Sequence, residues 1–478
     1  MDALVKRHQA APGESVEQTL YEIHQKVYLR AVTGIFATWR WALVLLTQLV
    51  FYGSPWLTWN GRQAVLFDLA ARKFYIFGLV FWPQDIVYLA VLLIVCAYSL
   101  ILFTAVAGRL WCGYACPQTV YTEIFMWIER KVEGERLARM KLDKGPLSTR
   151  KFALKALKHG LWIALALWTG FTFVGYFTPI KTLAREVLTL STGPWESFWI
   201  LFYGFATYGN AGWMREQVCK YMCPYARFQG VMFDPDTLVI TYDRERGEPR
   251  GSRSRSEDYK AKGLGDCVDC SVCVQVCPTG IDIRKGLQYE CIGCAACIDG
   301  CNRVMEKMGY PKGLIRYSTE NALKGHYDTE RIAKRVLRPR VLIYTAILWA
   351  IIIAALITLY NRVPLKVDVI RDRGSVMRDP DDEKAQNVYR LQIMNTQEVA
   401  RDVRISVSGL DGIELRGEAQ PIRVAATSSR VVPVRVEASR RLGHQGSNRI
   451  QFTIEAADPE KSDQPPIKVV ERATFVIE

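Results

Sequence analysis

The stretch from Cys267 to Cys301 constrains this chain more than any other, because it contains eight cysteines in two tight groups. Each group follows the spacing C-x2-C-x2-C-x3-C, which is typical of bacterial ferredoxins with two [4Fe-4S] clusters. In such ferredoxins the fourth cysteine of each group binds the cluster of the other group. The spacing therefore predicts one cluster on Cys267, Cys270, Cys273 and Cys301, and a second on Cys291, Cys294, Cys297 and Cys277.

Zinc is the alternative ligand for closely spaced cysteines. Structural zinc sites use pairs of cysteines separated by a longer loop, whereas two complete groups of four stand close together here. The small residues Gly293, Ala295 and Ala296 leave room for the backbone to wrap around a cluster, and Pro278 turns the chain away after the first group. We therefore expect iron–sulfur clusters rather than zinc.

Five apolar runs lie outside this stretch. A helix needs about 20 apolar residues to cross a bilayer, and most of the runs reach or approach that length. Tryptophan and tyrosine stand at their ends, as they do at membrane interfaces, so buried helices of a soluble protein are the weaker explanation. The run at 197–213 is short and partly polar. The expected spans are Trp39–Leu57, Ile86–Ala107, Leu161–Ile180, Ser197–Trp213 and Val341–Tyr360.

The basic residues indicate an orientation. The formal net charge is +14, and lysine and arginine gather in segments 109–158 and 215–340 but are sparse in 62–85 and 181–196. By the positive-inside rule, the N-terminus and the cysteine-rich insert are cytoplasmic and residues after Tyr360 are periplasmic. A reducing compartment also suits the thiols. Nucleic-acid binding is the rival explanation of basic loops, and we expect none. Segment 1–38 shows no signal peptide.

Two further cysteine pairs share the pattern C-x3-C-P, each directly after an expected span: Cys112/Cys116 and Cys219/Cys223. Proline suits the first turn of a helix, so the cysteine before it lies near a helix N-terminus, where the partial positive charge favours a thiolate. Soft thiolates suit Cu(I) or a further iron–sulfur cluster. The alternative is four packed, unreactive cysteines, and packing is the expectation for Cys96.

Other sequence features concern further cofactors, segment 118–140 and the C-terminal tail. The sequence has no C-x-x-C-H for attached haem and no G-x-G-x-x-G for a dinucleotide. Segment 118–140 is amphipathic and is predicted to be one helix at the bilayer surface. The cysteine-free tail alternates apolar and polar residues between turn formers, which predicts an immunoglobulin-like sandwich with a passive or a partner-binding role. Its expected strands are Val388–Met394, Val403–Val407, Ser429–Val436, Arg449–Ile454 and Lys468–Ile477.

These observations predict a multidomain membrane protein. Its fold class is an α-helical bundle of five spans, with an inserted two-cluster ferredoxin-like domain and a C-terminal all-β immunoglobulin-like sandwich. The predicted divisions are an N-terminal segment at 1–38, four spans with both C-x3-C-P pairs at 39–242, the linker and ferredoxin domain at 243–340, the fifth span at 341–360 and the sandwich at 361–478.

Three stretches, together with the double cysteine motif, carry a family resemblance. They are WCGYACPQTV at 111–120, CKYMCPYARFQ at 219–229 and YPKGLIRY at 310–317. On these motifs, over nearly its whole length, the chain resembles the CcoG/FixG/RdxA family, accessory proteins of bacterial cbb3-type cytochrome c oxidases. The resemblance implies an inner-membrane protein that reduces Cu(II) to Cu(I) and assists assembly of the oxidase.

In that family the residues matching Cys112, Cys116, Cys219 and Cys223 are associated with copper or redox chemistry. The resulting hypothesis is that a cytoplasmic donor reduces the two clusters, and that electrons pass to the membrane-face thiolates, where copper is reduced and retained. Oxidase subunits or copper chaperones are the expected partners. Two rivals stay open: a quinol-linked membrane electron carrier, and a non-enzymatic assembly scaffold whose tail is the binding surface.

Overall fold

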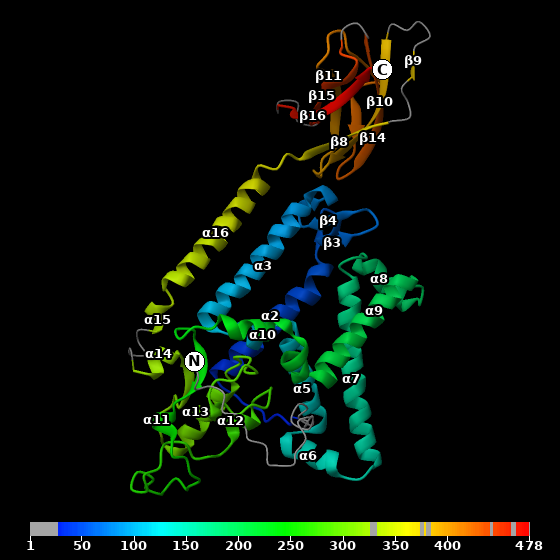
Figure 1. Ribbon diagram of the computed structural model, residues 1–478. Coiled ribbons are helices and arrows are strands. Elements are labelled where there is room, and N and C mark those ends of the chain that lie inside the picture. Colours follow the sequence, from blue (N-terminus) through cyan, green and yellow to red (C-terminus); the bar gives the residue numbers. More distant parts are fainter. Residues whose placement is uncertain are drawn as a thin grey trace, which may run out of the picture. The chain divides into compact units, whose positions relative to one another are not determined.

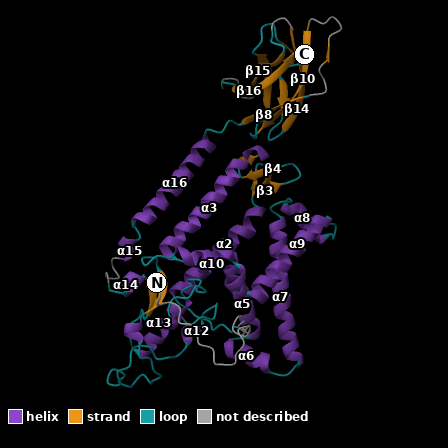
Figure 2. Ribbon diagram, in the orientation of Figure 1, coloured by secondary structure: helices purple, strands orange, loops and turns teal. Residues whose placement is uncertain are grey.

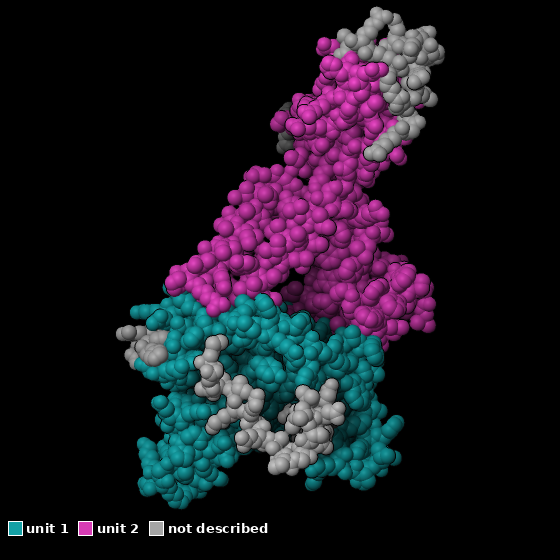
Figure 3. Space-filling model, in the orientation of Figure 1, with its two compact units in different colours: residues 1–46, 103–166, 205–338 teal, residues 47–102, 167–204, 339–478 magenta. Residues whose placement is uncertain are grey.

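The computed structural model describes residues 27–325, 332–372, 377–378, 384–439, 443–459 and 465–477. The chain forms two compact units (Figure 3). Unit 1 comprises residues 1–46, 103–166 and 205–338, and unit 2 comprises residues 47–102, 167–204 and 339–478. Most of the N-terminal segment expected at 1–38, including any signal for export, lies outside the described residues.

Within the described residues, four helical stretches are long and apolar enough to cross a membrane: Ile35–Trp56, Pro83–Ala107, Thr149–Val174 and Pro339–Tyr360. They correspond to the first, second, third and fifth expected spans. The buried share of the most apolar stretch is 0% for Pro83–Ala107, 11% for Pro339–Tyr360 and 17% for Ile35–Trp56, and it reaches 44% for Thr149–Val174. An exposed helix that is apolar on all sides requires a lipid environment. The third begins well before Leu161, because the basic segment after Thr149 continues the same helix.

The fourth expected span, 197–213, is helical but not uniformly α-helical. It is α9 (Pro194–Thr207), followed by two π-helical stretches, η3 (Tyr208–Met214) and η4 (Val218–Met222). The α-helical part has 14 residues, which is too short to cross a bilayer by itself. A fifth span therefore stays a prediction. Wide helical turns of this kind are frequent at functional sites, and η4 carries Cys219.

Unit 1 contains both kinds of cysteine motif (Figures 1 and 2). The segment predicted as one surface helix is two helices, because Gly134 at φ +90° ends the first of them. Phe125 and Glu129 on the first helix are fully buried, so this helix packs inside unit 1 rather than lying on a surface. The helices are α4 (Leu110–Tyr114), α5 (Pro117–Glu133), α6 (Arg136–Lys144), α10 (Pro224–Met232), α11 (Arg244–Gly247), α12 (Val272–Gln275), η5 (Ile283–Lys285), α13 (Ala296–Met308), α14 (Glu320–Leu323) and α15 (Ile332–Arg335).

A two-stranded antiparallel sheet closes the cysteine-rich segment. Strand β6 (Val239–Tyr242) pairs with β7 (Ile315–Ser318), so residues before and after the eight cysteines are joined. Ile240, Ile298, Met305 and Leu314 form the core beneath this sheet, together with several of the cysteine side chains. The sheet thus fixes both ends of the segment that carries the two cysteine groups.

The N-terminal half of unit 2 contains small sheets that the sequence reasoning did not anticipate. They follow α2 (Ile35–Gly53) and η1 (Ser54–Trp56), and they precede η2 (Pro83–Asp85) and α3 (Ile86–Ala107). The later helices that reach this unit are α7 (Thr149–Val174), α8 (Ile180–Leu188), α9 and α16 (Pro339–Tyr360). The strands are β1 (Thr58–Trp59), β2 (Arg62–Gln63), β3 (Val65–Asp68), β4 (Lys73–Ile76) and β5 (Leu79–Phe81).

The C-terminal tail folds into two antiparallel sheets. One has the order β12-β14-β10-β8 with β9 added beside β10, and the other has the order β13-β11-β15-β16. All five predicted strands lie within observed strands, whereas β8, β9, β12 and β13 were not predicted. The bounds are β8 (Leu365–Arg371), β9 (Met377–Arg378), β10 (Lys384–Asn395), β11 (Arg401–Ser408), β12 (Glu414–Gly417), β13 (Ile422–Val424), β14 (Ser429–Ser439), β15 (Gly446–Ala457) and β16 (Ile467–Ile477).

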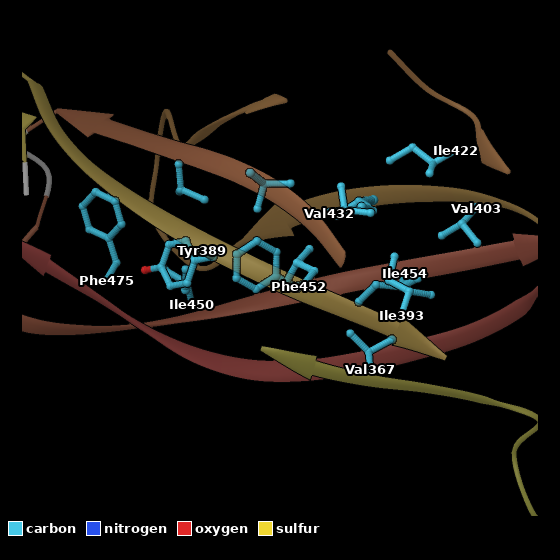
Figure 4. Packing of buried hydrophobic residues seen from close by; sticks show 14 of the residues in the cluster. Val367, Tyr389, Ile393, Val403, Ile422, Val432, Ile450, Phe452, Ile454 and Phe475 are labelled. Atoms are coloured by element: carbon cyan, nitrogen blue, oxygen red, sulfur yellow. The ribbon is translucent and has the colours of Figure 1, made fainter. Parts of the chain in front are cut away.

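The core of this tail lies between the two sheets (Figure 4). Alternate residues of β10 point inward, as the period of a strand requires. Tyr389 and Phe452 meet with ring centroids 5.2 Å apart, and the Tyr389 hydroxyl donates to the Thr474 carbonyl at 2.8 Å. Each sheet contributes one of these rings, so the sandwich has a core of its own.

Candidate functional site

The two cysteine groups adopt the same unusual backbone turn. Asp269 and Ser271 in the first group, and Gly293 and Ala295 in the second, all have positive φ between 50° and 69°. Only glycine adopts this region without strain, so three of the four positions carry a cost of about 1–2 kcal/mol each. Because the same two positions are left-handed in both groups, the repeat in sequence is a repeat in structure. Each turn directs its cysteines to one side, and a short helix begins directly after it, at α12 or α13.

The eight thiols line two separate small cavities. The residues of one cavity include Cys267, Cys270, Cys273 and Cys301. Those of the other include Cys277, Cys291, Cys294 and Cys297, with Cys273 at its edge. These are the two quartets that the crossed ferredoxin spacing predicts. We name them the first quartet and the second quartet.

The spacing of the thiols fits a cluster better than a single ion. A zinc ion with sulfur ligands at about 2.3 Å draws its thiolates to within about 4 Å of one another. Among the described residues, no three Cys, His, Asp or Glu side chains converge closely enough to bind one metal ion. The two small cavities that the quartets line are almost entirely apolar. The residues therefore fit iron–sulfur clusters, and they fit zinc poorly.

Burial changes the acidity of the quartet thiols. Desolvation raises the pKa of Cys273, Cys291 and Cys301 to about 12. For Cys291, hydrogen bonding from the Gly293 backbone and the charge of Arg109 act in the opposite direction, but burial outweighs both. These thiols are consequently protonated near neutral pH in the metal-free chain. Loading the quartets must release protons.

Helix α4 packs directly against the second quartet. A methyl group on Gly113 would lie 2.8 Å from the Ile292 carbonyl oxygen and 2.9 Å from the backbone of Cys294. Gly293 meets the backbone of Arg109 in the same way, at 3.2 Å. Two glycines thus permit the close approach of the two backbones. Cys112, which follows Arg109 on α4, is held beside the second quartet.

The two C-x3-C-P pairs come together at this place. The Cys112 thiol interacts electrostatically with Cys116, Cys219 and Cys223, and Cys112 and Cys219 both pack against the apolar cluster around Cys294. Cys116 and Cys223 are the N-cap residues of α5 and α10, each followed by its proline in the first turn. The helix positions inferred from the prolines are confirmed. We name these four side chains the membrane-face thiols.

The low pKa expected at the helix starts is wrong for Cys112, Cys116 and Cys219 in the metal-free chain. Burial is the largest effect and raises the pKa of Cys112 to about 12 and of Cys219 to about 11. For Cys116 the pKa is also raised, although the amides of Gln118 and Thr119 at the helix start oppose the shift. The field of the helix terminus is therefore present, but desolvation exceeds it. A bound metal ion would stabilise the thiolate forms of Cys112, Cys116 and Cys219.

Three polar side chains lie around the thiols, and sequence reasoning predicted only one of them, the positive charge of Arg109 beside the first C-x3-C-P pair. Arg109, 4% exposed, donates to the Ala226 carbonyl and lies near Cys112, Cys219 and Cys291. Gln229, 1% exposed, accepts from the Cys112 thiol at 3.5 Å and donates to Thr104 at 3.2 Å.

The third is Arg40, which interacts electrostatically with Cys294. No local motif marks these residues, although Gln229 ends the CKYMCPYARFQ stretch.

One carboxylate joins the cluster-binding segment to the first apolar helix. Asp299 lies between Cys297 and Cys301, and its Oδ2 accepts from the Ala37 amide at 2.8 Å. Gly34 is packed so closely against Asp299 that a methyl group there would overlap the carboxylate. The start of α2 is therefore capped by α13, the helix that carries Cys297 and Cys301.

Comparisons with known proteins agree with this arrangement. A 4Fe-4S dicluster domain model matches residues 214–320, a 4Fe-4S binding domain model matches residues 89–134, and a model of the IG-like fold at the C-terminus of FixG matches residues 355–478. The first range contains both quartets and Cys219 and Cys223. The second contains Cys112 and Cys116.

Three curated relatives cover different shares of the chain. "Nitrogen fixation protein FixG" of Rhizobium meliloti is 35% identical over 94% of this chain and 93% of its own length. "Protein RdxA" of Cereibacter sphaeroides is 38% identical over 83% of this chain and 85% of its own. "Ferredoxin-type protein NapH" of Haemophilus influenzae is 24% identical over 43% of this chain and 64% of its own.

Proposed function

The chain belongs to the FixG/RdxA family of iron–sulfur electron-transfer proteins, and from this premise we propose that it reduces Cu(II) to Cu(I) at the membrane-face thiols. When bound, iron–sulfur clusters supply one-electron transfer. The observation that carries the proposal is the placement of Cys112 and Cys219 against the Cys294 loop of the second quartet. A redox centre and a soft-metal site share one apolar wall there.

The membrane-face thiols suit the product of this reaction. Each Cu(II) ion takes up one electron, and a one-electron donor on the side of the quartets supplies it. Thiolates stabilise Cu(I) over Cu(II), because soft ligands prefer the softer ion. The positive charge of Arg109 beside Cys112 and Cys219 offsets the negative charge that two or more thiolates bring into a buried site. In the metal-free chain the amide oxygen of Gln229 accepts from the Cys112 thiol and orients that side chain.

We further propose a placement in the cell. The N-terminus and both quartets face the cytoplasm, the sandwich faces the periplasm, and the apolar helices lie in the inner membrane. Cuprous ions pass from the thiols to oxidase subunits or copper chaperones of a cbb3-type oxidase. The loops of the sandwich are the partner surface on the periplasmic side.

The test is the rate of Cu(I) formation by purified, cluster-loaded protein. Protein reduced anaerobically and freed of excess reductant is mixed with Cu(II) and a Cu(I)-specific chelator. We expect Cys112→Ser/Cys219→Ser to slow Cu(I) formation at least about tenfold, which corresponds to 1.4 kcal/mol in the barrier. Cys96→Ser is the matched control, because Cys96 is exposed on α3 and belongs to neither motif. Equal rates for the two variants would contradict the site.

A second candidate function is electron transfer without copper, through a third iron–sulfur cluster on the membrane-face thiols. It is favoured by two observations. Both C-x3-C-P pairs lie within ranges matched by 4Fe-4S models, and within the described ranges no three of these thiols approach as closely as a single ion requires. A quinol-linked carrier would have this form. Iron analysis decides, because only this candidate predicts that Cys112→Ser/Cys219→Ser lowers the iron content by one cluster per chain.

A further inference from the structure

Unit 1 contains a cavity of about 480 Å³ that is distinct from the spaces lined by the quartets. Its walls are the chain at 29–34, the first turns of α2, and parts of α5 and α6. Four arginines line it, namely Arg30, Arg40, Arg130 and Arg139, against the single carboxylate of Glu123. Neither the copper proposal nor the cluster sites account for this concentration of positive charge.

Two of these arginines are buried and incompletely bonded. Arg40 is 5% exposed and pairs with Glu123 at 3.0 Å, and Arg139 is 2% exposed and lies 3.6 Å from Glu129. The Nε–H group of each is buried without a hydrogen-bond partner. A buried donor without an acceptor is destabilising, because it has lost its hydrogen bond to water and gained none in the protein. Two of the arginines that line the cavity thus keep a donor that the described residues leave unused.

The other two arginines carry charge that the described residues leave unmatched. Arg30 is exposed and Arg130 is half-buried, and neither forms an ion pair with any residue in the described ranges. An anion at this position would neutralise them. It would also lie beside the guanidinium groups of Arg40 and Arg139, which line the same cavity.

The opposite wall of the cavity is apolar. Trp41 and Trp127 lie edge to face at 6.3 Å, and Leu45 is 65% exposed on α2, one of the helices able to span a membrane. Tryptophan at the end of a span is typical of the lipid interface. A ligand that fills this space must have a negative head group and an apolar body.

We infer that the cavity binds an anionic phospholipid. Its phosphate lies among the four arginines, and an acyl chain lies against Trp41 and Leu45. Basic pockets between membrane helices bind anionic head groups for this reason. A neutral quinol would leave the arginine charges unmatched, and inorganic phosphate would leave the apolar wall uncovered. This inference is independent of copper reduction.

A lipid bound at this site would also affect the second quartet. Arg40 lies beside Cys294, and Val276, which also lines the cavity, directly precedes Cys277 of the second quartet. A bound phosphate would therefore neutralise positive charge next to this quartet. It would also hold α2 and α5 against the cluster-binding segment.

The test measures lipid retention by the full-length, cluster-loaded protein after delipidation in detergent. Native mass spectrometry follows the binding of phosphatidylglycerol, phosphatidylcholine, a short-chain quinol and inorganic phosphate. We expect phosphatidylglycerol to bind in preference to the other three. Arg30→Gln/Arg130→Gln should weaken that binding by about thirtyfold, which corresponds to about 2 kcal/mol for the loss of two arginines near a lipid head group.

The control is Arg150→Gln/Arg255→Gln, which removes the same charge at two exposed positions outside the cavity. It should bind phosphatidylglycerol as the unmodified protein does. The inference is overturned if phosphatidylcholine, the quinol or free phosphate binds as well as phosphatidylglycerol, or if both double variants lose lipid equally. Selectivity is measured on the unmodified protein, so a folding defect in a variant would not hide the answer.

Discussion

Replacing Arg40 with glutamine removes a buried cation beside the second quartet and leaves the first quartet unaltered. Arg40 is 5% exposed, interacts electrostatically with Cys294, and forms a 3.0 Å ion pair with Glu123. A reduced cluster carries one more negative charge than an oxidised one. A neighbouring cation therefore stabilises the reduced form, and its removal should lower the reduction potential of the second centre.

The size of the effect follows from Coulomb's law. A unit charge about 6 Å away contributes about 3 kcal/mol at an effective dielectric constant of about 20. For a one-electron couple, 59 mV corresponds to about 1.4 kcal/mol, so the upper bound is about 120 mV. Relaxation of the site and of Glu123 reduces this value. We expect the Arg40→Gln variant to lower the potential of the second centre by about 50–100 mV.

The assay is a redox titration followed by electron paramagnetic resonance, which resolves the two centres. Arg40→Lys is the matched control because it keeps the charge, and its potential should stay within about 20 mV of the original. Glu123→Gln should move the second centre in the opposite direction. The reasoning is refuted if both centres shift together, or if lysine and glutamine at position 40 give the same potential.

Three further predictions concern contacts that position the site or the tail. Gly113→Ala should destabilise the cluster-loaded protein by about 1–3 kcal/mol and lower its iron content, because the added methyl group meets the Cys294 backbone at 2.9 Å. Thermal unfolding and iron analysis measure the two effects. Gly160→Ala on α7 is the control and should change neither, because a methyl group there would have no neighbouring atom within 4 Å. Asp299→Ala removes the cap of α2, and thermal unfolding should report a loss of about 1 kcal/mol; an unchanged melting temperature would exclude that role. Asp85→Asn leaves Arg362, 2.6 Å away, without its buried partner, and calorimetry should show a loss of about 3–5 kcal/mol in the unfolding of unit 2 alone.

Local sequence patterns predicted the parts of this molecule that depend on neighbours in the chain. Cysteine spacing grouped the two quartets, because the turn that directs the thiols is completed within a few residues. Proline after Cys116 and Cys223 placed two helix starts for the same reason. Alternation along β10 and β14 predicted strands, since the inward face of a strand is set by its own period.

The features that the sequence patterns did not predict mostly depend on contacts between residues far apart in the chain. Arg40 and Arg109 are remote from the second quartet in sequence, and only the folding of α2 and α4 against residues 291–294 brings them there. The acidity of Cys112 was mispredicted because the helix terminus acts locally, whereas burial depends on every element that packs around the thiol. The third span was predicted to begin at Leu161, because a window on apolar residues does not include the basic turns from Thr149 onward.

The most direct test of the central claim is a single-turnover measurement of electron transfer to copper. Protein with both quartets loaded and reduced is mixed anaerobically with excess Cu(II), and the iron–sulfur absorbance and the Cu(I) formed are followed together. Reoxidation should yield one Cu(I) per electron held, and it should stop when all four membrane-face thiols are replaced by serine. Reoxidation at an unchanged rate in the four-serine variant would contradict the account.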